Sequence, residues 1–441
     1  MQARKSEVGL KTSGFSMSNI RSLFVIMLCG VYASCTAMVV DNRFFPLFPK
    51  PYTRTKERPS QFSAEVFFMA ADSSYGDREE SIGWPEIFGR YDQTNESQGM
   101  VDLGLPSPLL DEWRGFDIKW RMDGKLQAQG IALYYDQAIT EQFSFGGTWL
   151  FMKSNSWHNF FFDNNNSTGR FTDADRLELD QERRQMNQIL GLCGPEAKQS
   201  GSGDIELYIR YGYLSEYCYK FRRMDVGLKV GALIPTGVKR NIFSPASVPF
   251  GGDGFWGFYV QGEGEFELKE DLIAGIMIRA SKRIAKTRLE RCIVVLNNGN
   301  MQIVDNSLLY GVLAAPIFVD PGATIMASPY VALDHVRAGL GGRLRYTLVV
   351  HEPDDWRDRR PENLRPVAIP ESLGNERPLD EKLRWAYDYV SLTAYYDFNS
   401  FTCDEGLAAR VYLTWDFPVQ LFKAYNMSKT NKISLGVEVH F

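Results

Sequence analysis

The chain has 441 residues, enough for one large domain or two to three small ones. Its net charge of −5, with 23% charged residues, argues against general nucleic-acid binding, which needs a basic surface. With only 4 His and 6 Cys, we expect no His- or Cys-rich metal centre, and we predict no cofactor.

The first 37 residues have the features of a secretory signal peptide. A basic residue precedes the apolar run 23–29, and small residues follow, so that cleavage after Ala33 or Ala37 is expected. The true start could be Met17, which gives a basic region of normal length. The run is too short to cross a membrane as a helix, and no other segment approaches about 18 consecutive apolar residues. Residues 1–37 are therefore predicted to be a signal peptide.

A proline-rich, basic stretch follows over residues 38–61, with Pro46, Pro49, Pro51 and Pro59. Proline cannot donate to a strand ladder, so this stretch is not expected to be a strand. We interpret it as a periplasmic or plug-like extension that precedes a domain over residues 62–441.

The rest of the chain is dominated by alternation of apolar and polar residues, the period of a β-strand with one apolar face. Segments with this pattern, some of them less regular, lie at 62–70, 101–105, 116–122, 126–136, 143–151, 205–213, 224–234, 256–268, 272–281, 323–333, 338–348, 384–398, 407–417 and 432–441. The segments from residue 116 onward number about 12, and the first two would raise the count to 14. Asp123-Gly124-Lys125 suits a tight hairpin turn between two of them.

The links between these segments alternate between long and short. The long ones are 154–203, 235–254, 282–322, 351–383 and 418–431, and the short ones are 137–141, 214–221, 269–271, 334–337 and 399–406. Long extracellular loops and short periplasmic turns are typical of outer-membrane barrels. In the longest loop we predict a helix that begins near Asp173, contains Leu177 and Met186, and could narrow the mouth of a barrel.

The last ten residues alternate without a fault and end on Phe441. This segment resembles the C-terminal strand of Gram-negative outer-membrane β-barrels, which ends in an aromatic residue and serves as their assembly signal. The Pro-Thr-Gly at residues 235–237 is similar to the one in barrels related to hydrophobic-compound and fatty-acid transporters. The resemblance implies an outer-membrane location, contact with the bilayer, and recognition by the barrel-assembly machinery. The predicted fold is an all-β, up-and-down antiparallel transmembrane barrel of 12 or 14 strands.

In such a barrel the polar face of each strand points into the lumen. We predict a solute pathway lined by Asp117, Lys119, Arg121, Glu206, Arg210, Lys229, Glu263, Glu265, Arg279, Arg343, Arg345 and Arg410. Charges of both signs on opposing walls favour hydrophilic solutes. Equally, they could pair across strands and fill the interior. The predicted function is a channel for passive or facilitated diffusion of small solutes.

Two other functions stay open. A barrel enzyme, either a lipid hydrolase or a protease, needs a nucleophile or acidic pair beside a His, and no such arrangement stands out around the four His. A surface adhesin or structural barrel would have its lumen closed by ion pairs. Cys193 and Cys292 both fall in predicted outer loops and could form a disulfide in an oxidising compartment.

Overall fold

The computed structural model describes residues 41–51, 54–216, 221–293, 307–337, 339–361, 382–398 and 408–441. All of them belong to one compact unit, Thr36–Phe441. The predicted signal peptide, residues 1–37, lies outside the described residues. Within the described residues, no helix is both long enough and apolar enough to cross a membrane.

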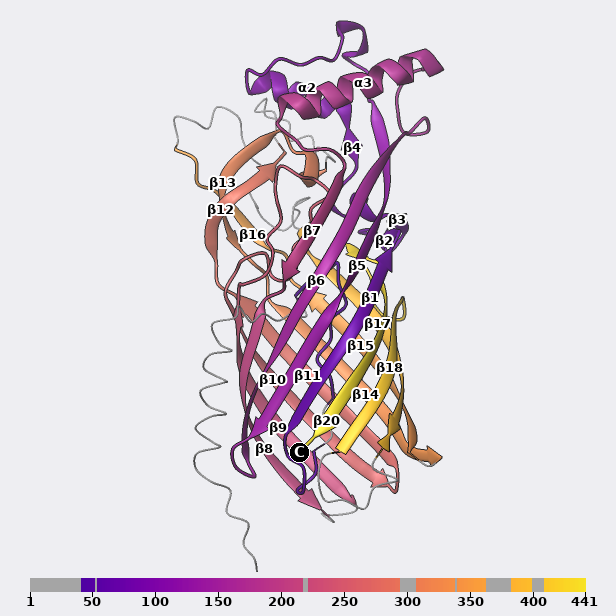
Figure 1. Ribbon diagram of the computed structural model, residues 1–441. Helices are drawn as coiled ribbons and strands as arrows, with labels where there is room; N and C mark the ends of the chain where they lie inside the picture. Colours follow the sequence, from indigo (N-terminus) through magenta and orange to yellow (C-terminus); the bar gives the residue numbers. More distant parts are fainter. Residues whose placement is uncertain are drawn as a thin grey trace, which may run out of the picture. The chain divides into compact units, whose positions relative to one another are not determined.

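The unit is built on a closed antiparallel barrel of 12 strands, which confirms the predicted fold class (Figure 1). The barrel strands are β1 (Gln61–Ala71), β5 (Lys119–Ala138), β6 (Phe143–Phe162), β8 (Ile205–Glu216), β9 (Arg223–Ile234), β10 (Gly257–Lys269), β11 (Leu272–Arg283), β14 (Thr324–Arg337), β15 (Leu340–His351), β17 (Trp385–Asp397), β18 (Ala408–Val419) and β20 (Asn431–His440). The ring of strands is completed by the pairings of β1 and β5. Strand β1 pairs with β20 and β5, and β5 pairs in turn with β6.

The predicted hairpin at Asp123-Gly124-Lys125 is wrong, because β5 runs straight through these residues. Its alternation continues in phase from Trp120 to Ala138, and it stays paired with β6 over that whole length. Gly124 serves close packing: a Cβ there would clash with the Trp157 carbonyl oxygen and lie 2.7 Å from Trp84 Nε1. The two predicted segments 116–122 and 126–136 therefore belong to one strand.

The predicted strand at 101–105 is also wrong. Residues Gln93–Asp102 form helix α2, whose first turn is capped by the Asp92 side chain accepting a hydrogen bond from the Asn95 amide. Gln93, Glu96 and Met100 are buried on one face of this helix. The count of 12 strands is reached because the segment at 62–70 is β1.

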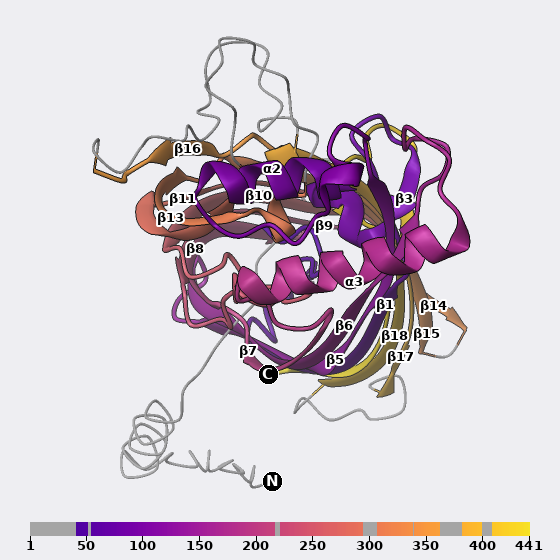
Figure 2. The ribbon, with the colours of Figure 1, turned by 90° about the horizontal axis from the view of Figure 1, so that it is seen from above.

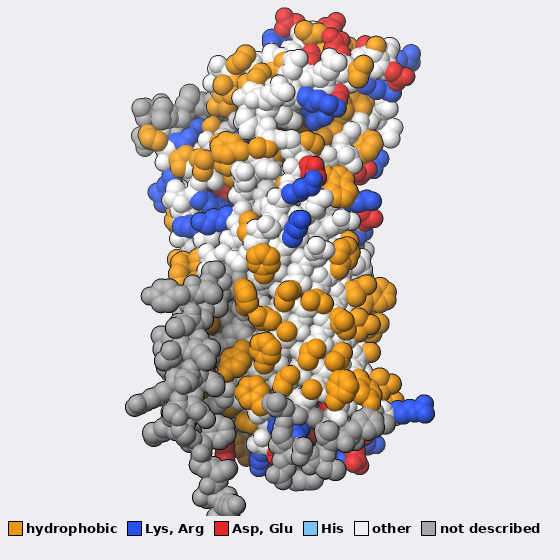
Figure 3. Space-filling model, viewed as in Figure 1, with side chains coloured by type: hydrophobic (Ala, Val, Ile, Leu, Met, Phe, Trp, Pro, Cys, Tyr) orange, Lys and Arg blue, Asp and Glu red, His pale blue; other side chains and the backbone are white. Residues whose placement is uncertain are grey.

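The outside of the barrel is apolar over a broad band, where hydrophobic side chains cover most of the strands while charged side chains lie above and below (Figure 3). Exposed members of this band include Phe68, Ile209, Val230, Phe258, Ile278, Leu344, Leu413 and Leu435. Exposed aromatic residues lie toward both of its edges, among them Trp256, Trp415, Tyr211 and Phe441. An apolar band flanked by aromatic residues is the exterior of a barrel that spans a membrane.

Connections on the side of the C-terminus are short, and those at the other end are long, as predicted. The long ones carry α2, helix α3 (Asp173–Ile189) and the 3-10 turns η1 (Trp84–Phe88), η2 (Asp111–Trp113) and η3 (Leu308–Tyr310). They also carry the short strands β2 (Ser73–Tyr75), β3 (Ser81–Gly83), β4 (Tyr91–Asp92), β7 (Glu196–Ser202), β12 (Lys286–Cys292), β13 (Leu313–Asp320), β16 (Asp355–Asp358) and β19 (Met427–Ser428). We call this end, with the upper halves of β5 and β6, the outer extension.

The outer extension encloses an apolar core that closes the outer end of the lumen. Trp84, Trp120, Met122, Phe250 and Tyr310 are among its buried members. Seen from above, α3 crosses over this end (Figure 2). The structure confirms the predicted helix near Asp173, with Thr172 as its cap in a reciprocal capping box with Asp175.

Candidate functional site

The lumen is occupied by the chain's own N-terminal segment, which we define as residues 41–51 together with Arg54. At its outer end Asp41 lies 3.1 Å from Arg283 on β11 and accepts a hydrogen bond from Ser281. At its inner end Arg54 forms an ion pair with Asp136 at the end of β5. The segment therefore runs the length of the lumen from the outer extension toward the side of the C-terminus.

Midway along, the segment is held by both apolar and ionic contacts. Phe48 is 4% exposed and packs edge-on against Tyr389, with ring centroids 5.3 Å apart. Arg345 on β15 donates to the Pro49 carbonyl oxygen at 2.8 Å. Lys50 lies 2.6 Å from Glu65 on β1 and 3.8 Å from the centroid of the Tyr412 ring. These contacts seat the segment against β1, β15, β17 and β18.

Glu65 connects the segment to a longer chain of charges on the barrel wall. It lies 3.1 Å from Lys432 on β20, which in turn lies 3.3 Å from Asp416 on β18. Asp416 also pairs with Arg345 at 3.4 Å. Glu65 and Asp416 are almost completely buried. Each charge in this network of ion pairs therefore depends on its partners for stability.

The opposite wall, formed by β8 to β11, carries charges that pair with one another. Arg279 on β11 reaches Glu206 on β8 at 3.0 Å and stacks over Tyr259, 3.6 Å from its ring centroid. Lys229 on β9 lies 2.9 Å from Glu263 on β10. The Lys229–Glu263 pair joins two neighbouring strands, and the Arg279–Glu206 pair spans from β11 across β10 and β9 to β8; neither uses the N-terminal segment. In the middle of this wall the four charges therefore need no partner from the segment, whereas Arg283, at the outer end of β11, pairs with Asp41.

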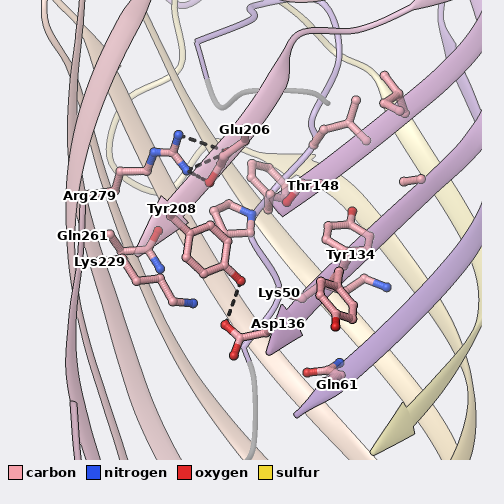
Figure 4. Close-up of a pocket in the computed structure, with 16 residues that line it drawn as sticks. Lys50, Gln61, Tyr134, Asp136, Thr148, Glu206, Tyr208, Lys229, Gln261 and Arg279 are labelled. Atoms are coloured by element: carbon pink, nitrogen blue, oxygen red, sulfur yellow. Dashed lines mark hydrogen bonds and ion pairs between the residues drawn. The ribbon is translucent and has the colours of Figure 1, made fainter. Parts of the chain in front are cut away.

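In the middle of the lumen, the described residues leave small cavities between the segment and the wall. One of 60 Å³ is bounded by Lys50, Tyr134 and Tyr208 and by the Arg279–Glu206 pair (Figure 4). A second, of 40 Å³, lies beside Arg343 and Arg410. A water molecule takes up about 30 Å³ in the liquid, so each cavity has room for one or two waters. By contrast, a cavity of 470 Å³ lies at the inner mouth beside Arg58 and His440. In this conformation the N-terminal segment closes the middle of the lumen.

The structure places nine of the twelve predicted pathway residues on the inner wall: Glu206, Arg210, Lys229, Glu263, Glu265, Arg279, Arg343, Arg345 and Arg410. Asp117, Lys119 and Arg121 are not there. They belong to the outer extension, where Asp117 and Arg121 are exposed and Ile118, Trp120 and Met122 face inward. The reason is that the enclosed volume at this level is an apolar core, which reverses the polarity expected of a wet lumen.

Sequence reasoning missed the residues that hold the segment in place. Glu65 shares its face of β1 with Phe67 and Met69, so the alternation gave no clear polar side. Lys50 and Arg54 lie in a stretch without any period, and its basic character was the only signal. Cys193 and Cys292 are both free, so the predicted disulfide is not formed.

One hydrogen-bonded chain resembles the groups of a hydrolase. The Thr324 hydroxyl lies 2.8 Å from His351 Nδ1, and His351 Nε2 lies 3.0 Å from Asp354. Thr324 and His351 face each other as a cross-strand pair of β14 and β15, so strand register alone accounts for their contact. The described residues hold no group of three or more His, Cys, Asp or Glu able to bind a metal ion.

Comparison with known proteins gives structural likenesses alone. No protein-family model matches the chain, and no curated protein matches it. An outer-membrane channel from Pseudomonas putida F1 aligns over 89% of this chain and 100% of its own, with a TM-score of 0.42 and 11% identity. A mutant of the monoaromatic hydrocarbon channel TodX aligns over 92% and 97%, with a TM-score of 0.34 and 9% identity. The β domain of the Bordetella autotransporter BrkA aligns over 87% and 99%, with a TM-score of 0.32 and 10% identity. Scores and identities this low say nothing of function or substrate.

Proposed function

We propose that this protein is an outer-membrane channel for small solutes, and that its own N-terminal segment closes the lumen at rest. The observation that carries the proposal is the division of the lumen into two parts. In the middle of the wall of β8 to β11 the charges pair with one another. The N-terminal segment is a separate strip of chain, held by the ion pairs of Asp41, Lys50 and Arg54 and by apolar packing such as that of Phe48. If the strip moves, a barrel with a charged inner wall remains.

The charged wall supports a hydrophilic solute. Arg279, Glu206, Lys229 and Glu263 present both signs of charge toward the same space. Such a wall offers hydrogen bonds and a transverse field to polar molecules and nothing to purely apolar ones. We infer that solutes pass along this wall once the segment has left, and that these four residues contribute most to selectivity.

A test is available in two lysine variants of the same region. Lys50→Gln removes the ion pair with Glu65, whereas Lys56→Gln changes an exposed lysine six positions further along. Current through planar bilayers should show longer or more frequent openings for Lys50→Gln than for the parent protein. Lys56→Gln should behave like the parent. Equal currents in all three would contradict the proposal.

The closed lumen itself favours a second candidate, a structural or adhesive barrel. The outer extension with α2 and α3 would then bind the partner, and the lumen would stay closed permanently. A folded barrel that carries no current with or without its N-terminal segment would favour this alternative.

We also propose that the barrel-assembly machinery recognises β20. Phe441 is 40% exposed, and its backbone exchanges two hydrogen bonds with Ser60, just before β1. The last residue thus lies at the seam where the barrel closes. Phe441→Ala should reduce the amount of heat-modifiable barrel in outer membranes, while the same variant refolded in detergent should be close to normal.

A further inference from the structure

A cavity of 140 Å³ lies at the outer end of the N-terminal segment, and we call it the outer cavity. Asp41, Arg43 and Phe44 of the segment form one side of it. The other side comes from the outer ends of the barrel and the outer extension, including Arg283, Trp356 and Trp385. An apolar cavity of roughly 150 Å³ holds one benzene molecule, so this space suits a ligand of one ring.

Arg43 is the residue of this cavity whose buried charge an anionic ligand would stabilise. It is 9% exposed, and its guanidinium lies over the Phe88 ring, 3.9 Å from the centroid. Its guanidinium donates one hydrogen bond, to the Lys382 carbonyl oxygen at 3.0 Å, and none of the described carboxylates forms an ion pair with it. A buried guanidinium without a carboxylate is costly, and the aromatic contact offsets only part of that cost.

The carboxylates around the cavity are already engaged. Asp41 pairs with Arg283 at 3.1 Å. Asp253 pairs with Arg288 at 2.7 Å, and Asp354 contacts His351 at 3.0 Å. Each of these acids therefore already has a side-chain partner, and two of the three partners are arginines. Arg283, in contrast, has one terminal nitrogen, Nη2, with no hydrogen-bond partner, although the residue is 5% exposed. Arg288 Nε and Trp356 Nε1 also lack a partner, so the unused hydrogen-bonding capacity that the described residues offer this cavity is that of donors.

Aromatic rings form another part of the lining. Phe44 and Phe88 lie 6.0 Å apart by ring centroids, and Trp385 stacks on His351 with centroids 4.8 Å apart. Aromatic faces bind a planar apolar body, while guanidinium groups bind a carboxylate with paired hydrogen bonds. From these two halves we propose that the outer cavity binds a small monocarboxylate with a single-ring apolar body.

A consequence for gating follows if the proposed channel function holds. Asp41 and Arg43 both belong to the N-terminal segment, and Asp41 holds Arg283 through an ion pair. A carboxylate bound in the cavity competes with Asp41 for that guanidinium. Ligand binding then weakens the outer attachment of the segment, and the ligand promotes opening of the lumen. The binding site itself does not depend on the channel function.

The test uses the mature full chain in detergent and two probes of one shape. Benzoate carries the carboxylate, and benzyl alcohol is its neutral counterpart. Binding is followed by calorimetry and by tryptophan fluorescence, since Trp356 and Trp385 line the cavity. We expect benzoate to bind at least about tenfold more tightly than benzyl alcohol, the advantage of a charge-assisted contact.

Three variants locate the site. Arg43→Gln should weaken benzoate binding by about tenfold or more and leave benzyl alcohol unchanged. Val319→Phe, which fills the cavity from β13, should weaken both probes. Arg121→Gln, an exposed arginine elsewhere on the outer extension, should change neither. A heat-modifiable gel shift verifies that each variant is folded.

Equal binding of both probes, or benzoate binding that survives both Arg43→Gln and Val319→Phe, would overturn the proposed site. Bilayer current is measured separately with benzoate on the extracellular side. Binding with the expected variant pattern supports the site whatever the current does. If benzoate binds in this pattern and the current never changes, the site stands and the gating consequence fails, whereas the channel proposal fails only if Lys50→Gln also leaves the current unchanged.

Discussion

Arg210 on β8 lies 2.7 Å from Asp225 on β9, and both side chains are buried in the barrel lumen. Arg210 also pairs with Glu263 on β10, so one guanidinium joins three neighbouring strands. Such a group organises the wall at one level and cannot be removed without leaving buried carboxylates short of a partner.

Arg210→Met should therefore destabilise the barrel. Removing one partner of a buried pair costs about 3–5 kcal/mol, since the carboxylates that remain are desolvated. Urea unfolding of the protein in lipid vesicles would measure the change in the free energy of unfolding. Arg121→Gln, at an exposed arginine, should change it by less than about 0.5 kcal/mol. Similar values for the two variants would refute the structural role of Arg210.

Gly124 provides a second prediction, because β5 and η1 approach each other closely there. An added methyl group would clash with the Trp157 carbonyl oxygen and press on Trp84. Gly124→Ala should cost about 1–3 kcal/mol, in the range of other overpacked sites. Gly262→Ala on β10 is the matched control, since a Cβ there has no neighbour within 4 Å. Protease resistance of the outer extension is the readout, and equal resistance of both variants would contradict the packing described.

Because the Glu182 carboxyl on α3 is buried, we expect the stability of the outer extension to depend on pH. Burial raises the pKa of this carboxyl to about 7, with Glu178 and Glu112 adding in the same direction. Its Oε1 accepts a hydrogen bond from the Leu110 amide, while Oε2 has no partner. Because the pKa is higher in the folded than in the unfolded state, ionisation opposes folding. The attachment of α3 should be strongest below about pH 4.5 and weaken as the pH rises to about 7.

Hydrogen exchange of the amides in Asp173–Ile189 would measure this weakening at several pH values, after correction for the intrinsic exchange rate. Glu182→Gln keeps the hydrogen bond to Leu110 and removes the ionisation. The variant should lose the pH dependence and be better protected than the parent at pH 8. A parent protein whose α3 protection does not fall between pH 4.5 and 7 would contradict the assignment.

The alternation in the sequence predicted the barrel well, because a strand with one lipid face repeats its pattern over its whole length. Strands such as β20 and β18 lie where the period placed them. Errors arose where the environment changes along a strand. On β5 the inward face passes from Trp120 and Met122 to Tyr134 and Asp136, so no single polarity marks the inside.

The N-terminal segment could not be predicted in detail for a related reason. It has no period of its own, and its place is set by contacts distant in sequence, such as Lys50 with Glu65 and Arg54 with Asp136. Nine predicted pathway residues do lie on the inner wall, yet the pairing of the six on β8 to β11 depends on strand order and register. That information is absent from the pattern of any one strand.

The most direct measurement is single-channel current of the mature chain, defined as residues 38–441 from the predicted signal-peptide boundary, against a variant that also lacks residues 41–54, both shown to be folded by a heat-modifiable gel shift. The variant keeps the Lys229–Glu263 and Arg279–Glu206 pairs, and Arg283, which loses Asp41, keeps Asp204, so the barrel should fold and conduct. We predict steady current for the variant and rare openings for the mature chain, with closure restored by adding a peptide of residues 41–54. A folded variant that stays as silent as the mature chain would contradict the account.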